Sequence, residues 1–141
     1  MTLNRIASKD LADTIAGLQW LELDAKEALE ITSWDIPTLI LRQQKVEPIN
    51  FIVEHENKVL SIIIIDLAGN LTYFNTVDMK DYTLSYLRYL KPQLEAYCKL
   101  FDIELTVDVM NWYTTSEKKL KLLGFKQIGR YGDRISYGKS V

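Results

Sequence analysis

The stretch that decides the fold is Val107-Asp108-Val109-Met110-Asn111-Trp112, followed shortly by Lys119-Leu120-Lys121-Leu122-Leu123-Gly124-Phe125. Apolar and polar residues alternate in the first segment and predict a strand over 103–109. The second segment predicts a helix that is capped by Thr115 or Ser116, runs through Leu123 and ends where Gly124 adopts a left-handed conformation. These residues therefore predict a strand, a turn and a helix that ends at a glycine, and the other elements are predicted on either side of this unit.

Outward from this stretch, the sequence predicts further elements on both sides. Downstream, residues 125–131 and 134–137 form a hairpin across Gly132-Asp133. Upstream, leucines with helical spacing predict a long helix over 78–101, with Pro92 causing a kink near Arg88 or a break into two helices. The expected core-facing stripe of this helix consists of Leu84, Leu87, Leu90, Leu94, Tyr97, Cys98 and Phe101.

The first half of the chain predicts a strand, three short helices and a meander. The strand covers 3–7, and Ser8, Asp24 and Asp35 are the expected helix-start residues. Residues 49–53, 59–66 and 71–75 are β-branched or alternating and are separated by short turns. The predicted fold class is therefore a mixed α/β (α+β) sheet protein, with an antiparallel meander followed by helix, strand, helix and a C-terminal hairpin.

Composition indicates one globular domain spanning 1–141. The 141 residues are 48% hydrophobic and 26% charged, which excludes disordered and collagen-like chains. Cys98 is the single cysteine, so no disulfide can form within the chain, and with one histidine no zinc site is expected. The longest apolar run, 59–65, is too short to cross a membrane, so a cytoplasmic protein is expected. The sequence contains no Gly-x-Ser-x-Gly motif, so a serine hydrolase is not expected.

The element order, with the quoted strand, helix and Leu-Gly-Phe segment, resembles the GNAT (Gcn5-related N-acetyltransferase) fold. The closest similarity is to small GNAT-like proteins of T7-type podophages that are described as internal virion or acetyltransferase-like proteins. The resemblance covers most of the chain. It implies acetyl-CoA as cofactor, host cytoplasm or virion as location, and N-acetyl transfer as reaction if the protein is active.

The segment expected to hold the cofactor departs from the family pattern. The family binds the acetyl-CoA pyrophosphate on a Q/R-x-x-G-x-G/A loop between the fourth strand and the long helix, where glycines let backbone N–H groups approach the phosphates. Residues 74–81 contain no glycine, and Asp78 and Asp81 add negative charge at the helix start. The remaining cofactor-binding candidates are Asn75, Thr76 and Lys80.

The family's catalytic positions also differ in this chain. Members often carry an Asn at the start of the last helical unit and, seven residues later, a Tyr that protonates the departing thiolate. Counting back from Gly124, these places hold Tyr113 and Leu120, and a leucine side chain cannot donate a proton. Tyr113 and Asn111 are therefore the candidate catalytic residues. Trp112 lies where the resemblance places the opening between two strands, and we interpret it as filling that opening in place of ligand.

Other features have a structural and a functional interpretation. Glu54-His55-Glu56 is interpreted as a solvated turn, with a catalytic base as the alternative. We interpret Cys98 as buried and structural in preference to a thiolate nucleophile. Tyr82, Tyr86 and Tyr89 widen the apolar stripe of the long helix or, alternatively, bind a protein partner.

Charge divides the chain. Residues 1–78 carry 6 basic and 12 acidic side chains, net −6, and residues 79–141 carry 11 and 7, net +4. The basic segment 117–141 is interpreted as a solvated face, with nucleic-acid binding as the alternative. The missing glycine loop and Leu120 favour a degenerate phage-type protein that binds a protein partner or a second copy. It would be a virion component or an infection-stage effector with no cofactor. The alternative is an acetyl-CoA-dependent N-acyltransferase with a divergent pyrophosphate loop.

Overall fold

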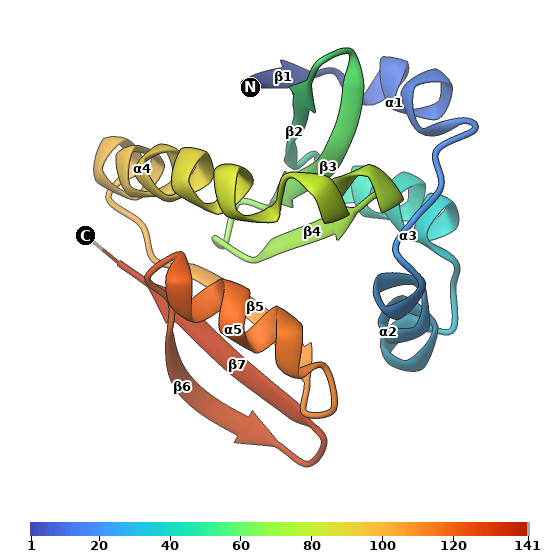
Figure 1. The fold of residues 1–141 in the computed structure, drawn as a ribbon. Coiled ribbons are helices and arrows are strands. Elements are labelled where there is room, and N and C mark those ends of the chain that lie inside the picture. Colours follow the sequence, from blue (N-terminus) through green and yellow to red (C-terminus); the bar gives the residue numbers. More distant parts are fainter. Residues whose placement is uncertain (141) are drawn as a thin grey trace. The chain divides into compact units, whose positions relative to one another are not determined.

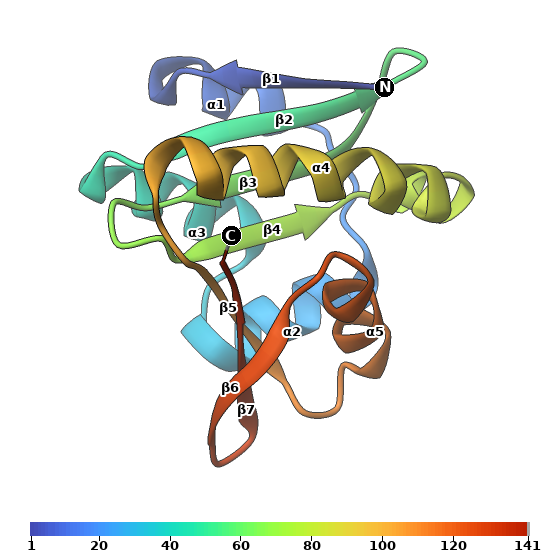
Figure 2. The ribbon, with the colours of Figure 1, turned by 90° about the vertical axis from the view of Figure 1, so that its left-hand side faces the viewer.

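In the computed structural model, which describes residues 1–140, the first sheet is built around strand β3 (Lys58–Ile65). Its isoleucines are buried on both faces of the sheet, as expected of a β-branched run in a central strand. The strand order is β1-β2-β3-β4, with β1 at Thr2–Ile6, β2 at Ile49–His55 and β4 at Leu71–Asn75. Figure 2 shows these four strands side by side. The predicted first strand and meander are confirmed.

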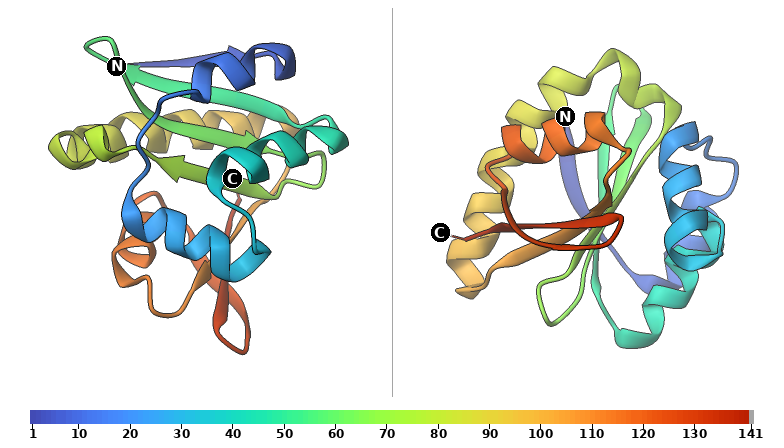
Figure 3. Two further views of the ribbon diagram at one scale, coloured as in Figure 1. Left: turned by 90° about the vertical axis from the view of Figure 1, so that its right-hand side faces the viewer. Right: turned by 90° about the horizontal axis from the view of Figure 1, so that it is seen from below.

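Three helices cover one face of this sheet, as Figure 1 and the right panel of Figure 3 show. They are α1 (Ser8–Ile15), α2 (Glu22–Thr32) and α3 (Ile36–Gln43), and a short 3₁₀ helix, η1 (Gln44–Val46), follows. Together the helices and the sheet form a buried apolar cluster of Leu11, Ile15, Ala28, Ile36, Leu39, Ile40, Ile52, Ile62, Ile64 and Phe74. The strand members of this cluster, Ile52, Ile62, Ile64 and Phe74, are all even-numbered, in agreement with the alternation of a strand.

Of the three helix starts predicted in the first half of the chain, two are wrong in detail. Asp35 caps α3 as predicted, and its carboxylate accepts the Thr38 N–H at 2.9 Å. Ser8 is the first residue of α1 and donates its hydroxyl to Gln44 at 2.6 Å in place of capping its own helix. Asp24 lies in the first turn of α2, after the cap position at Leu21. The side chains of Ser8 and Asp24, which the local sequence predicts as helix caps, thus bond to residues distant in the chain.

The second part of the chain contains the long helix and a three-stranded sheet. Helix α4 (Thr83–Phe101) precedes β5 (Leu105–Met110), α5 (Thr114–Leu122), β6 (Lys126–Tyr131) and β7 (Arg134–Lys139). The strand order is β5-β7-β6, and both pairings are antiparallel. The cap position of α5 is Tyr113, so the predicted cap at Thr115 or Ser116 is wrong. Gly124 has φ +92, which confirms the glycine stop, and the antiparallel pairing of β6 with β7 confirms the C-terminal hairpin.

The long helix differs from its prediction in three respects. Residues 77–81 form a separate 3₁₀ helix, η2 (Val77–Asp81), so α4 begins five residues later than expected. It continues through Pro92 as one helix, so the predicted break into two helices is wrong, and the alternative kink near Arg88 stays a prediction. Leu84 and Phe101 are half or more exposed although spacing placed them in the core, while Tyr86 is buried. The apolar stripe is therefore rotated toward Tyr86, Leu87, Leu90, Leu94 and Cys98.

Gly69 and Asn70, which directly precede β4, pair with β5. Asn70 and Thr106 form a parallel bridge, the Thr106 N–H donates to the Gly69 carbonyl at 2.9 Å, and the Thr106 hydroxyl bonds the Asn70 side chain at 2.8 Å. Gly69 has φ +88, and a Cβ at this position would lie 2.3 Å from the Glu104 carbonyl oxygen. Only glycine fits at this crossing.

The chain divides into two compact units. One comprises residues 1–68 and 72–81, and the other comprises 69–71 and 82 onward. The first has 7 basic and 13 acidic side chains, net −6, and the second has 10 and 6, net +4. The charge division expected from the sequence therefore coincides with the structural division. A single domain over 1–141 stays a prediction.

Candidate functional site

The C-terminal end of β4 has one backbone edge toward β3 and one facing outward. The Thr76 N–H donates to the Leu60 carbonyl of β3 at 3.0 Å, and the Thr76 hydroxyl donates to the Val59 carbonyl at 2.6 Å. Because successive residues of a strand alternate in direction, the backbone groups of Asn75 and Val77 lie on the outer edge. This edge precedes η2 in the segment to which the sequence assigns cofactor binding.

The outer edge is occupied by Gln19–Leu21, here called the edge segment, which connects α1 to α2. Trp20 and Thr76 form an antiparallel bridge. The Leu21 N–H donates to the Asn75 carbonyl and the Val77 N–H donates to the Gln19 carbonyl, each at 2.9 Å. The edge segment therefore behaves as a short added strand on β4.

Asp24 closes the same edge with a side chain. This residue is 6% exposed, and its Oδ2 accepts the Asn75 N–H at 2.7 Å. Asn75 is itself 1% exposed, and its side-chain Oδ1 has no hydrogen-bond partner in the described structure. A buried acceptor without a partner costs free energy unless water or a ligand satisfies it. Asp24 and the edge segment were not identified from the sequence, where Asp24 reads as an ordinary helix-start residue.

The residues do not fit a pyrophosphate in this arrangement. Anion binding by a loop requires backbone N–H groups that point away from other acceptors. The N–H groups of Asn75, Thr76 and Val77 donate to Asp24, Leu60 and Gln19 as described, and that of Met79 donates to the Thr76 carbonyl at 3.1 Å. Asp78 and Asp81 add negative charge in η2, whereas Lys80 is exposed and is the single cation of that helix.

The candidate catalytic residues follow β5 in the second unit. Tyr113 is at the cap position of α5, is 3% exposed and stacks on Trp112, with ring centroids 5.3 Å apart and planes 9° apart. Asn111 is half-buried, and its N–H donates to the Asp133 carbonyl at 2.7 Å. Leu120 is fully buried. Asn111 and Tyr113 are thus close in the chain, but a catalytic role for them stays a prediction.

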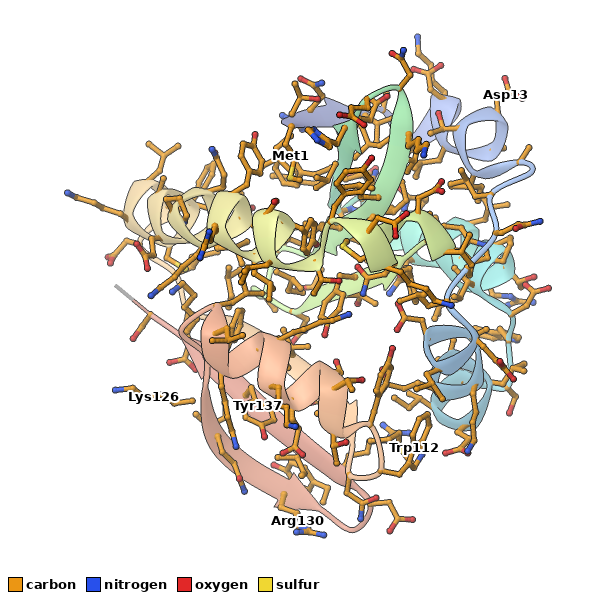
Figure 4. All side chains as sticks on the ribbon, in the orientation of Figure 1. Met1, Asp13, Trp112, Lys126, Arg130 and Tyr137 are labelled. Carbon is orange, nitrogen blue, oxygen red and sulfur yellow. The ribbon has the colours of Figure 1, made fainter. Side chains whose placement is uncertain are left out.

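A buried polar pair in this unit was not identified from the sequence. Tyr137 on β7 is fully buried, and its hydroxyl donates to a carboxylate oxygen of Glu117 on α5. Figure 4 shows Tyr137 where α5 crosses the sheet. Burial first, and then the hydrogen bond and charge of Glu117, raise the pKa of Tyr137 to about 12. The pair holds α5 on the sheet with a neutral phenol.

The single cysteine, the tyrosines of the long helix and the histidine turn have the following positions. Cys98 is buried as expected, and burial raises the pKa of its thiol. Tyr86 is in the core, which supports the structural interpretation for it, while Tyr82 and Tyr89 are half-buried and their partner role stays a prediction. His55 ends β2 with its Nε2 3.8 Å from Glu56 Oε1 beside an exposed turn.

The basic segment has one member that is not on a solvated face. Lys139 is 5% exposed, and its ammonium lies 3.4 Å from the Glu95 carboxylate. The other lysines and arginines of segment 117–141 are mostly exposed, among them Lys126 and Arg130, which Figure 4 labels. Within residues 1–140, no group of three or more His, Cys, Asp or Glu side chains could hold a metal ion. No helix in that range is long and apolar enough to span a membrane.

Comparison with known proteins finds similarity in structure only. No family model matches the sequence, and no curated protein matches it. The GNAT domain of S. lividans PAT has a TM-score of 0.75 and 10% identity, covering 99% of this chain and 89% of that one. The fold is GNAT-like.

Two further acetyltransferases show the same GNAT-like fold. Ribosomal-protein-alanine N-acetyltransferase from Brucella melitensis has a TM-score of 0.65 and 14% identity over 100% of both chains. Campylobacter jejuni N-acetyltransferase PseH, solved in complex with acetyl coenzyme A, has a TM-score of 0.62 and 9% identity over 99% of this chain and 97% of that one. At these identities the similarity establishes the fold and not the activity.

Proposed function

We propose that the protein is an acyl-CoA-dependent N-acyltransferase with a divergent pyrophosphate loop. The observation that carries this proposal is the similarity in fold to acetyltransferases over essentially the whole chain, with a TM-score of up to 0.75 among the structures compared. One of these enzymes was solved with acetyl coenzyme A. The link from fold to activity is an analogy, so the activity has to be tested on this chain.

Within this proposal, the chain's own residues have defined tasks. Asn75 ends β4, Thr76 follows it, and Lys80 is an exposed cation in η2, the segment where the resemblance places the cofactor phosphates. Tyr113 carries a phenol, whose ordinary pKa near 10 suits a proton donor to a leaving thiolate. Asn111, two residues earlier, would assist by hydrogen bonding.

A second candidate function is protein binding without catalysis, and a specific observation favours it. Leu120, which takes the place of the family's acidic tyrosine, is fully buried, and residues 75–81 contain no glycine. A degenerate GNAT-like protein of phage type, acting as a virion component or an infection-stage effector, would need neither the proton-donating tyrosine nor the glycine-rich phosphate loop. Opposite net charges on the two units would support binding to a macromolecule or to a second copy.

Isothermal titration of the full chain with acetyl-CoA and with CoA separates the two functions. Micromolar binding supports the transferase and contradicts the degenerate protein, whereas the absence of binding to either compound contradicts the transferase. Thermal denaturation provides a second measurement, since a ligand at 100 times its Kd adds about 2.7 kcal/mol of stability.

If acetyl transfer to an amine is then detected, Tyr113→Phe and Asn111→Ala test the assigned roles. We expect a loss of roughly 100-fold or more in kcat for Tyr113→Phe, which is the usual contribution of a positioned acid. Tyr131→Phe is the matched control because this side chain is 76% exposed. Unchanged kcat in both candidate variants would contradict the assigned roles.

A further inference from the structure

We propose that β1 is an interaction surface that pairs edge to edge with β1 of a second copy of this chain. The two strands run antiparallel about a two-fold axis, so the first sheets of the two copies join into one continuous sheet. This association goes beyond the proposed transferase function and does not depend on it.

The outer edge of β1 carries no partner strand in the described part of the chain. Residues 2–6 pair with residues 50–54 of β2 in five consecutive antiparallel pairs without a bulge, and β1 is the outermost strand of its sheet (Figure 2). Within residues 1–140, no backbone group of β1 has a hydrogen-bond partner outside this ladder. The N–H and carbonyl groups of an unpaired edge are a template on which another strand can add.

The other sheet edges are each partly covered or protected. The edge segment Gln19–Leu21 pairs with the end of β4, and Asn70 pairs with β5. Strand β6 carries a bulge and the cations Lys126 and Arg130, and both features are means by which proteins protect an exposed edge. In contrast, β1 has no bulge, no proline and no lysine, so its regular ladder is the unprotected edge among the strands described.

The sequence of β1 is compatible with pairing to itself. With Asn4 on the two-fold axis, this residue faces its own copy, and all five residues of the strand are paired. Thr2 then faces Ile6 of the second copy. Leu3 faces Arg5, so no like charges meet across the two strands. Centring the axis on Arg5 would place two guanidinium groups opposite each other, and this repulsion disfavours that register.

Net charge predicts how the association depends on salt. The first unit carries net −6, so two such units repel each other and salt screens this repulsion. A contact between the acidic unit of one copy and the basic unit of another would instead weaken as salt rises. A pair of five-residue strands buries less area than a standard interface, so we expect a weak dimer with a Kd on the order of 100 µM.

Sedimentation equilibrium of the full chain, with no residues added before Met1, measures the association. We expect the mean mass to rise from one chain toward two between about 10 µM and about 1 mM protein. The Kd should fall about two-fold or more from about 0.05 M to about 0.5 M NaCl. A mass of one chain at about 1 mM overturns the second copy and leaves a strand of another protein as the occupant. A Kd that rises with salt also overturns it, in favour of a contact between oppositely charged units.

Charge substitutions at the two-fold axis test the register. Asn4→Lys and Asn4→Asp each place like charges opposite each other in the pair of strands. Gln19→Lys and Gln19→Asp are the matched controls, since Gln19 is exposed at the opposite edge of the same sheet and the change in net charge is the same. We expect the Kd of each Asn4 variant to be roughly two- to five-fold higher than that of the Gln19 variant of equal charge.

A one-to-one mixture of the two Asn4 variants should associate more tightly than either variant alone, because opposite charges then meet at the axis. The same mixing experiment with the two Gln19 variants should show no such gain. All four variants should keep the wild-type Tm, because the substituted side chains are exposed. Equal Kd values for Asn4 and Gln19 variants, or a mixture no tighter than the separate Asn4 variants, would overturn pairing through β1.

Discussion

The substitution Tyr137→Phe tests the buried pair that fixes α5 on its sheet. Phenylalanine keeps the ring of a fully buried side chain and removes the hydroxyl that donates to Glu117. A hydrogen bond to a charged group contributes about 1.5–3 kcal/mol, so we expect the free energy of unfolding to fall by about 2 kcal/mol. For a chain of this length, that corresponds to a decrease in Tm of about 6 °C.

The same pair predicts how stability depends on alkaline pH. The folded pKa of Tyr137 is raised from 10.0 to about 12, so its stabilisation is complete below pH 10 and is lost as pH rises through 12. A shift of that size corresponds to about 3 kcal/mol in total. Most of it is lost by pH 12, so the stability difference between wild type and Tyr137→Phe should shrink to near zero there.

Urea denaturation of both proteins at several pH values from 8 to 12 measures these quantities directly. The comparison cancels the titration of the other tyrosines and the lysines, which both proteins share. Tyr131→Phe is the control, because its side chain is 76% exposed and its removal should cost less than about 0.5 kcal/mol. A Tyr137→Phe loss no larger than that of the control, or a difference that does not change with pH, would refute the reasoning.

Two further substitutions test the ends of β4. Gly69→Ala places a Cβ 2.3 Å from the Glu104 carbonyl oxygen at φ +88, so we expect a loss of about 2–4 kcal/mol in urea denaturation; a loss under about 0.5 kcal/mol would show that the crossing can relax. Asp24→Ala leaves the buried Asn75 N–H without its carboxylate acceptor and should cost about 1–3 kcal/mol. Glu22→Ala, on the exposed side of the same helix turn, should cost little, and equal losses in the two variants would contradict the role given to Asp24.

Much of the fold follows from local pattern. The β-branched run of β3, the Asp35 cap of α3, the Gly124 stop and the C-terminal hairpin are all where spacing and turn chemistry predict them. These features depend on interactions within a few residues along the chain, which sequence periodicity records. For the same reason the GNAT-like fold class could be predicted.

The candidate site was less predictable because its contacts join distant residues. Asp24 reads as a helix cap, yet its carboxylate accepts an N–H from Asn75, 51 residues away. Nothing in the local pattern of Gln19–Leu21 indicates that it pairs with β4. Similarly, Leu84 has the spacing of a core residue but lies in the first turn of α4 and is 58% exposed.

The sequence by itself determined the order of elements, the absence of glycine after β4, the leucine at position 120 and the division of charge along the chain. Each of these is a property of residue identity and near-neighbour spacing. Only the tertiary structure decided which backbone donors after β4 are engaged, because a hydrogen bond between distant segments depends on how the chain folds back on itself. The N–H groups of Val77, Asn75 and Thr76 therefore donate to Gln19, Asp24 and Leu60, which no pattern in the segment after β4 indicates.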